Sequence, residues 1–168
     1  MNARERQALL EEELLLVRHS GEIPEVALHA SLHYLRDDTD GPGLQLTVQE
    51  IQTLEAGVIA RYQEIILRDL NADNRKRSLF RGIRRANHNW YRFVRFSDQS
   101  GLSYEEFRDR AAKTLLHYLQ TTLTERINDN DIPAVNCLPE ALLTFAIALG
   151  IDGAQLPENW PSLCEKSP

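Results

Sequence analysis

Apolar residues recur at intervals of three and four positions through almost every part of this sequence, which is the spacing of an α-helix and not of a β-strand. The clearest signal begins at Thr47. Glu50 follows three residues later, which is the pattern of a capping box, and Leu46 can pack on Ile51 as a hydrophobic staple. The helix predicted from this start runs to about residue 70. Its apolar face consists of Ile51, Leu54, Val58, Tyr62 and Ile65.

Similar signals predict the other helices. A first helix is expected over residues 2–19, and a second begins at Pro24, where the missing N–H of proline costs nothing. A basic helix follows a loop at 71–74 and ends near 100–101. The next helix, expected to continue to about residue 128, begins with a second apparent capping box formed by Ser103 and Glu106. The last helix runs from about 139 to Gly150, where glycine can adopt a left-handed conformation and Ile151 can pack back.

The length of the chain, 168 residues, is that of one ordinary domain, which buries about two-thirds of the surface that its unfolded chain exposes. We find no internal repeat and no linker between the helical segments. Short loops between helices favour antiparallel neighbours. The sequence therefore predicts an all-α, single-domain bundle of about six helices, mostly antiparallel, over residues 1–151. An irregular tail is expected over residues 152–168.

Targeting and cysteine signals point to the cytoplasm. Acidic residues interrupt the apolar residues near the N-terminus, so this segment does not resemble a secretory signal. The longest nearly apolar stretch, 141–151, is too short to cross a bilayer. Cys137 and Cys164 have neither metal-ligand spacing nor the density of a disulfide scaffold. We therefore expect a cytoplasmic protein with no transmembrane segment and no cofactor.

Charge is distributed very unevenly along the chain. The net charge is −6, but the segment from residue 75 to residue 95 holds eight of the 19 basic residues and none of the 25 acidic ones. Placed on a helical wheel, most of these basic residues fall within an arc of about 100°, while Ile83, Trp90 and Phe93 lie on the opposite side. The candidate binding residues along this arc are Arg77, Arg81, Arg84, Arg85, His88, Arg92 and Arg95.

Arginine favours planar anionic partners such as carboxylates and phosphates, because its guanidinium group donates two parallel hydrogen bonds. The sequence therefore predicts a non-enzymatic adaptor or regulatory protein, as a monomer or a homodimer. Its basic helix would bind an acidic protein surface, a phosphorylated ligand or a nucleic acid. A pI of about 5.4 is low for a nucleic-acid-binding protein. The alternative is a structural or assembly protein whose arginines pair with its own carboxylates, such as Glu11, Glu12, Glu13, Glu55, Glu64 and Asp69.

A second alternative is a metal-binding helical-bundle enzyme. His29 and His33 are four residues apart, so both can lie on one face of a helix and share a divalent cation, and Asp37 continues the same spacing. Glu64, from the helix that begins after Thr47, is a further candidate ligand. Four-residue steps drift by about 40° each, however, and the motifs typical of di-iron bundles and zinc proteases are missing. A solvated polar helix edge is the competing interpretation.

Overall fold

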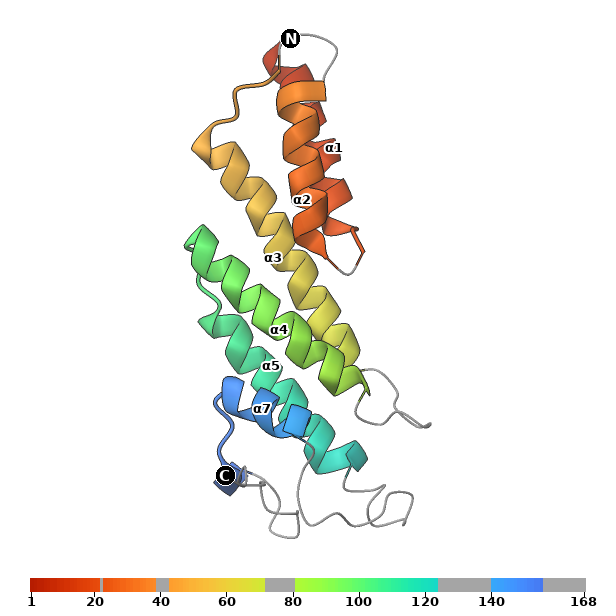
Figure 1. Ribbon diagram of the computed structural model, residues 1–168, viewed down its shortest axis with the longest axis vertical. Helices are drawn as coiled ribbons and strands as arrows, with labels where there is room; N and C mark the ends of the chain where they lie inside the picture. Colours follow the sequence, from red (N-terminus) through yellow and green to blue (C-terminus); the bar gives the residue numbers. More distant parts are fainter. Residues whose placement is uncertain (22, 39–42, 72–80, 124–139, 156–168) are drawn as a thin grey trace. The chain divides into compact units, whose positions relative to one another are not determined.

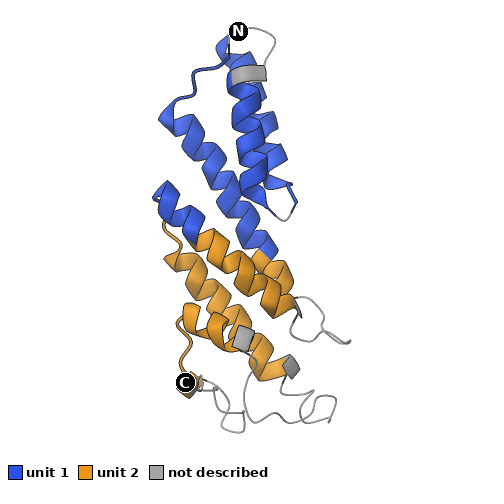
Figure 2. Ribbon diagram, viewed as in Figure 1, with its two compact units in different colours: residues 1–65, 95–102 blue, residues 66–94, 103–168 orange. Residues whose placement is uncertain are grey.

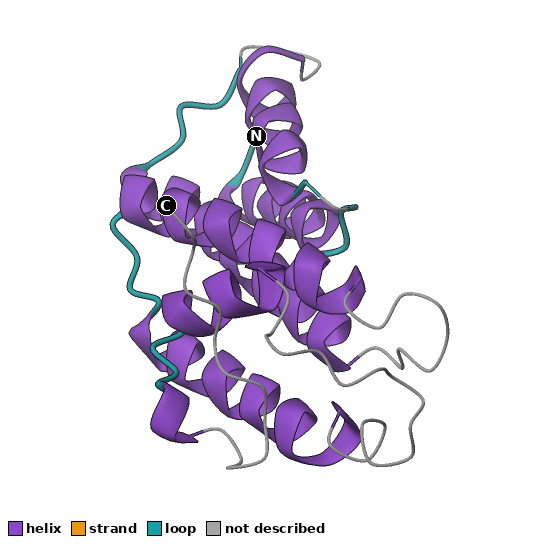
Figure 3. Cartoon of the chain, turned by 60° about the horizontal axis from the view of Figure 1, so that its bottom comes forward, coloured by secondary structure: helices purple, strands orange, loops and turns teal. Residues whose placement is uncertain are grey.

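The computed structural model describes residues 1–21, 23–38, 43–71, 81–123 and 140–155 (Figure 1). Over these residues the chain is helical and contains no strand, as Figure 3 shows. The predicted all-α bundle is confirmed. The six described α-helices are α1 (Ala3–Arg18), α2 (Pro24–His33), α3 (Val48–Asn71), α4 (Arg81–Ser100), α5 (Glu105–Tyr118) and α7 (Glu140–Ala148). Single π-helical turns follow α2 and α5, at Tyr34–Asp38 and Leu119–Leu123, and a 3₁₀ turn lies at Gly153–Gln155.

The chain folds into two compact units, which Figure 2 distinguishes by colour. The first unit comprises residues 1–65 and 95–102, and the second comprises residues 66–94 and 103–168. The first unit therefore contains α1, α2, most of α3 and the last residues of α4. The second contains the end of α3, most of α4, and α5 and α7.

In the first unit, α3 supplies the centre of the apolar core. Leu54, Val58 and Tyr62 are almost completely buried, as the period of the sequence predicts, and Val17 of α1 is fully buried with them. Gly57 lets α1 approach α3 closely, because a Cβ atom at this position would lie 2.7 Å from a methyl group of Leu14. A larger residue would force the Leu14 side chain to move.

Two polar contacts fix the turn between α1 and α2 to α3. The Arg61 Nε donates a hydrogen bond of 2.7 Å to the backbone carbonyl of Ser20. The buried hydroxyl of Tyr62 donates to the carboxylate of Glu25 in the first turn of α2. Because a buried hydroxyl without a partner is costly, Glu25 has a structural role in this unit.

An aromatic cluster forms the core of the second unit. The ring of Trp90 stacks on Phe107 at 6.1 Å between centroids and meets Tyr104 edge-on at 6.1 Å. Phe93 and Phe145 lie 5.4 Å and 6.3 Å from the same ring. Such pairs contribute about 0.5–1.5 kcal/mol each beyond the burial of their surface. The cluster thereby holds α4, α5 and α7 together.

Most of the predicted helix ends are confirmed. The Thr47 hydroxyl accepts a hydrogen bond from the Glu50 N–H at 3.1 Å, and the Glu50 carboxylate accepts from the Thr47 N–H at 2.9 Å. Gly101 and Gly150 have φ angles of 68° and 75°. At both glycines the next residue donates back to a carbonyl five residues earlier, which closes the helix in a Schellman motif. Ile151 is buried, as expected.

The predicted start of α5 is wrong. The helix begins at Glu105 with Tyr104 as its N-cap, and no side chain caps it, so Ser103 and Glu106 form no capping box. The physical reason is the packing of the Tyr104 ring against Trp90 and Phe93 in the aromatic cluster. Several other predicted segments, at 72–80, 124–139 and 156–168, lie outside the described residues.

The capping box at Thr47 can be tested by substitution. Thr47→Ala should lower the free energy of unfolding by about 1 kcal/mol, because it leaves the N–H of Glu50 without its acceptor. Thr53→Ala is the matched control. Thr53 is exposed in the same helix, its hydroxyl donates to the Gln49 carbonyl, and alanine has the higher helix propensity. Chemical denaturation of both variants measures the difference, and an equal loss in the two would contradict the role of the cap.

Candidate functional site

The buried face of α4 determines which of its side chains reach solvent. Ile83, Ala86, Trp90 and Phe93 are at most 5% exposed and face the core. They follow the three- and four-residue spacing of one side of a helix. The side chains on the opposite arc are therefore directed away from the core.

The basic residues lie on this opposite arc. Arg84, Arg85 and His88 are exposed and Arg92 is half-buried. Arg84 and Arg92 are separated by about 12 Å along the helix axis, from a rise of 1.5 Å per residue. We call these four residues the basic face; all four belong to the second unit. Of the other candidates, Arg95 is exposed in the part of α4 assigned to the first unit, Arg81 begins the helix without a described side chain, and Arg77 lies outside the described residues.

Within the described part of the chain, no carboxylate lies within 4.0 Å of the guanidinium groups of Arg84, Arg85, Arg92 or Arg95. Acidic residues pair with other arginines instead. Three carboxylates account for all the described pairs. Glu50 pairs with Arg6 at 2.7 Å, Glu64 with Arg61 at 3.4 Å and Arg18 at 3.9 Å, and Asp69 with Arg68 at 3.5 Å.

Tyr91 is a surface residue of α4 outside the set of candidates predicted from the sequence. Its side chain is 72% exposed, unlike the other aromatic residues of this helix. On the helical wheel Tyr91 lies about 40° from Arg77 and next to Arg84, so its position could have been found from the sequence. Binding surfaces of proteins are often enriched in aromatic residues and arginine, and this part of α4 has both.

The candidate metal ligands are spread over several environments. His29 and His33 are exposed on α2. Glu64 is engaged by Arg18 and Arg61, which compete with a metal ion for its carboxylate. Asp37 lies in the π-helical turn, and its side chain is not described. In the portion of the chain that is described, no three His, Cys, Asp or Glu residues are grouped so that they could hold a metal ion.

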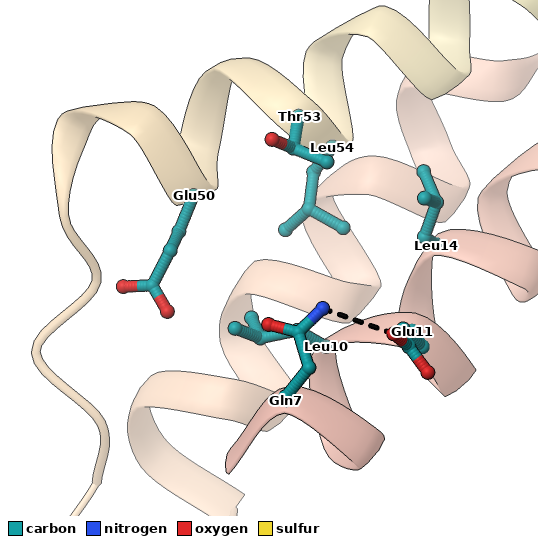
Figure 4. Close-up of a pocket in the computed structure, with 7 residues that line it drawn as sticks. All are labelled: Gln7, Leu10, Glu11, Leu14, Glu50, Thr53 and Leu54. Atoms are coloured by element: carbon teal, nitrogen blue, oxygen red, sulfur yellow. Dashed lines mark hydrogen bonds between the residues drawn. The ribbon is translucent and has the colours of Figure 1, made fainter. Parts of the chain in front are cut away.

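A small cavity lies between α1 and α3 in the first unit (Figure 4). Leu10, Leu14 and Leu54 provide its apolar lining. Its volume of about 100 Å³ is well below the roughly 300–1,000 Å³ of typical ligand pockets, so it cannot enclose a nucleotide-sized molecule. The polar residues that line it are Gln7, Glu11, Glu50 and Thr53. Gln7 donates a hydrogen bond of 3.0 Å to Glu11, drawn as a dashed line in Figure 4.

Glu50 at this cavity is held by a two-pronged ion pair. The Arg6 Nε and Nη2 atoms donate to the two carboxylate oxygens at 2.9 Å and 2.7 Å, and Nη2 also donates to the Gln45 carbonyl at 2.7 Å. The hydrogen bonds from Arg6, together with that from the Thr47 N–H, lower the pKa of Glu50 to about 2. This pair joins the start of α1 to the start of α3.

Asp69 is a buried carboxylate at the end of α3. It is 4% exposed, and its Oδ2 atom accepts no hydrogen bond from the residues that the structure describes. Arg68, the adjacent residue, approaches its other oxygen at 3.5 Å. Burial of a carboxylate with one unsatisfied oxygen is destabilising.

A comparison with models of protein families matches residues 5–151 to one described as a repeat of unknown function (DUF7826). The chain belongs to this family. No curated protein and no solved structure matches it. Among the described helices of this DUF7826 member, none is both long and apolar enough to cross a membrane.

The lowered pKa of Glu50 predicts how stability depends on pH. A carboxylate with a folded-state pKa of about 2 stabilises the fold at every pH above the ordinary value of 4.5, and this contribution is lost as the pH falls from 4.5 towards 2. Glu50→Gln should therefore lower the Tm at pH 7, and its difference from the unmodified chain should shrink as the pH falls through this range. Thermal unfolding followed by circular dichroism measures both.

Glu12→Gln provides the control for this experiment. Glu12 is exposed on α1 and forms no ion pair in the described part of the chain. Its variant should follow the unmodified chain at every pH. A constant difference between Glu50→Gln and the unmodified chain from pH 7 to pH 2 would contradict the assignment.

Proposed function

We propose that this chain is a non-enzymatic helical adaptor or regulatory protein that binds an anionic partner, foremost an acidic protein surface, through the basic amphipathic helix α4. The observation that carries the proposal is the exposure of Arg84, Arg85 and His88 without a carboxylate partner in the described part of the chain. Arg77, Arg81, Arg92 and Arg95 are the further candidate residues of this basic segment of the sequence.

The energetic argument rests on repulsion between neighbouring cations. Like charges at helical neighbour positions destabilise a helix by a few tenths of a kcal/mol per pair. Arg81 has two such neighbours, Arg84 three residues later and Arg85 four residues later. Carboxylates of a partner would relieve this repulsion and accept two hydrogen bonds from each guanidinium group.

Two properties favour an acidic protein over a nucleic acid. The pI of the whole chain, about 5.4, is low for a nucleic-acid-binding protein, and its net charge of −6 repels the dense charge of a phosphate backbone more strongly than that of a short acidic segment. Tyrosine and arginine are also among the residue types that contribute most to protein–protein affinity, and the exposed Tyr91 lies three residues after His88, on the same side of α4 as Arg84. An acidic helix or loop of a partner protein satisfies both conditions.

Helix α5 also carries arginines, but unlike those of α4 they have acidic residues at neighbouring helical positions. In α5 the half-buried Arg108 follows Glu105 by three residues, and the exposed Arg110 follows Glu106 by four. Opposite charges at these spacings reduce the local field even without direct contact. The described part of α4 has no acidic residue before Asp98.

A charge-reversal experiment tests the proposal. In the Arg84→Glu/Arg85→Glu double variant, affinity for a fluorescent polyglutamate peptide, measured by anisotropy at low salt, should fall by more than about tenfold. The Arg108→Glu/Arg110→Glu variant changes the net charge equally and should bind almost as well as the unmodified chain. Binding by the unmodified chain should weaken as salt is raised, because exposed charges are screened.

Parallel measurements separate the alternatives. A short double-stranded oligonucleotide that binds more tightly than the peptide, and loses its affinity in the same α4 variant, would replace the acidic protein by nucleic acid as the partner. Equal losses in the two double variants, or no binding of either probe, would refute the basic face as an interface. Circular dichroism confirms that both variants remain folded. Metal analysis of the purified protein tests the alternative site at His29 and His33.

A further inference from the structure

Two exposed histidines lie one helical turn apart on α2. His29 and His33 are both exposed, and both belong to the α-helical part of this segment, which ends at His33. The N–H of the next residue, Tyr34, still donates to the carbonyl of Ala30, so the α-helical spacing is kept up to His33. Four residues of α-helix correspond to a rise of about 6 Å and a rotation of about 40°, so both imidazole rings leave the helix on the same side.

This spacing allows both rings to coordinate one metal ion. Each imidazole can direct one ring nitrogen at an ion about 2.1 Å away, as pairs of histidines four residues apart do on metal-binding helices. The chain has five histidines, and His29 and His33 are the only two that are three or four residues apart. Because both ligands come from one helix, the site requires no contact between helices or between the two units.

We propose that His29 and His33 form a two-histidine chelate for a divalent transition metal ion of the Ni²⁺, Cu²⁺ and Zn²⁺ group. Imidazole nitrogen is a preferred ligand of these ions, whereas Mg²⁺ and Ca²⁺ prefer oxygen. Water fills the remaining coordination positions, so the ion is held at the surface and exchanges with solvent. The site differs from a buried centre of a helical bundle, for which the described residues provide no group of three ligands.

The residues around the pair leave it open to an ion. Val26, three residues before His29, has a short side chain that is 62% exposed. Glu25, four residues before His29, is half-buried, and Arg36, three residues after His33, is exposed. These opposite charges lie at the two ends of the pair, so their effects on a bound cation largely cancel. The affinity therefore depends on the two imidazoles, the second of which binds at a high effective concentration once the first is attached.

Isothermal titration of the full chain with NiCl₂ at pH 8 tests the chelate, because only neutral imidazole binds a metal ion. The His29→Ala and His33→Ala variants should each raise the dissociation constant by at least about tenfold, since each leaves a single ligand. His117→Ala is the matched control and should bind as the unmodified chain does. His117 is exposed in the last turn of α5 and has no His, Cys, Asp or Glu three or four residues away.

A second variant separates the spacing of the histidines from their number. His33→Ala/Ala30→His keeps two histidines at exposed positions of α2, but they are adjacent in the sequence and point about 100° apart. This variant should bind Ni²⁺ as weakly as His33→Ala does. All the substituted positions are exposed, so every variant should retain the circular dichroism spectrum of the unmodified chain.

Three results would refute the chelate. They are the absence of saturable Ni²⁺ binding, an affinity that His29→Ala and His33→Ala leave unchanged, and a His33→Ala/Ala30→His variant that binds as tightly as the unmodified chain. The His29→Ala/His33→Ala double variant should still bind the polyglutamate peptide, because both histidines lie in the first unit and the basic face lies in the second. The chelate and the proposed function can therefore fail separately.

Discussion

The aromatic cluster around Trp90 is the interaction on which the second unit depends. Four rings, from α4, α5, α7 and the N-cap of α5, surround the indole, and together they fix the rotation of α4 about its own axis. Once Trp90 and Phe93 face inward, helical geometry directs Arg84, Arg85 and His88 into water. The basic face is therefore a consequence of core packing, and its orientation is as stable as the cluster itself.

Local signals in the sequence were sufficient for most helices, because each depends on residues only a few positions apart. The capping box of Thr47 and Glu50 and the helix ends at Gly101 and Gly150 are formed by such neighbours, and each was predicted at its position. The capping box predicted at Ser103 is wrong because the start of α5 depends on residues that are distant in the sequence. Tyr104 belongs to a cluster whose members come from three helices, and tertiary packing outweighed the local capping pattern. The sequence around Ser103 does not indicate that Tyr104 packs against aromatic residues of other helices.

The candidate site was predictable only in part for the same reason. The spacing of the arginines places them on one side of a helix, and the position of Tyr91 follows from the same wheel. The sequence does not predict which carboxylate pairs with which arginine, because several of the partners are far apart in the sequence. Glu50 binds Arg6 across 44 residues, and Glu64, a candidate counter-charge or metal ligand by its sequence, pairs with Arg18 and Arg61. Long-range pairs of this kind depend on how helices pack, which periodicity does not specify.

The basic face and the core that positions it respond to different physical conditions. The basic face consists of exposed side chains, whose charges salt screens within about 10 Å at 0.1 M. The aromatic cluster depends on apolar burial, which salt leaves largely unchanged. A change in ionic strength therefore alters the electrostatic field of α4 without altering the direction in which its arginines point.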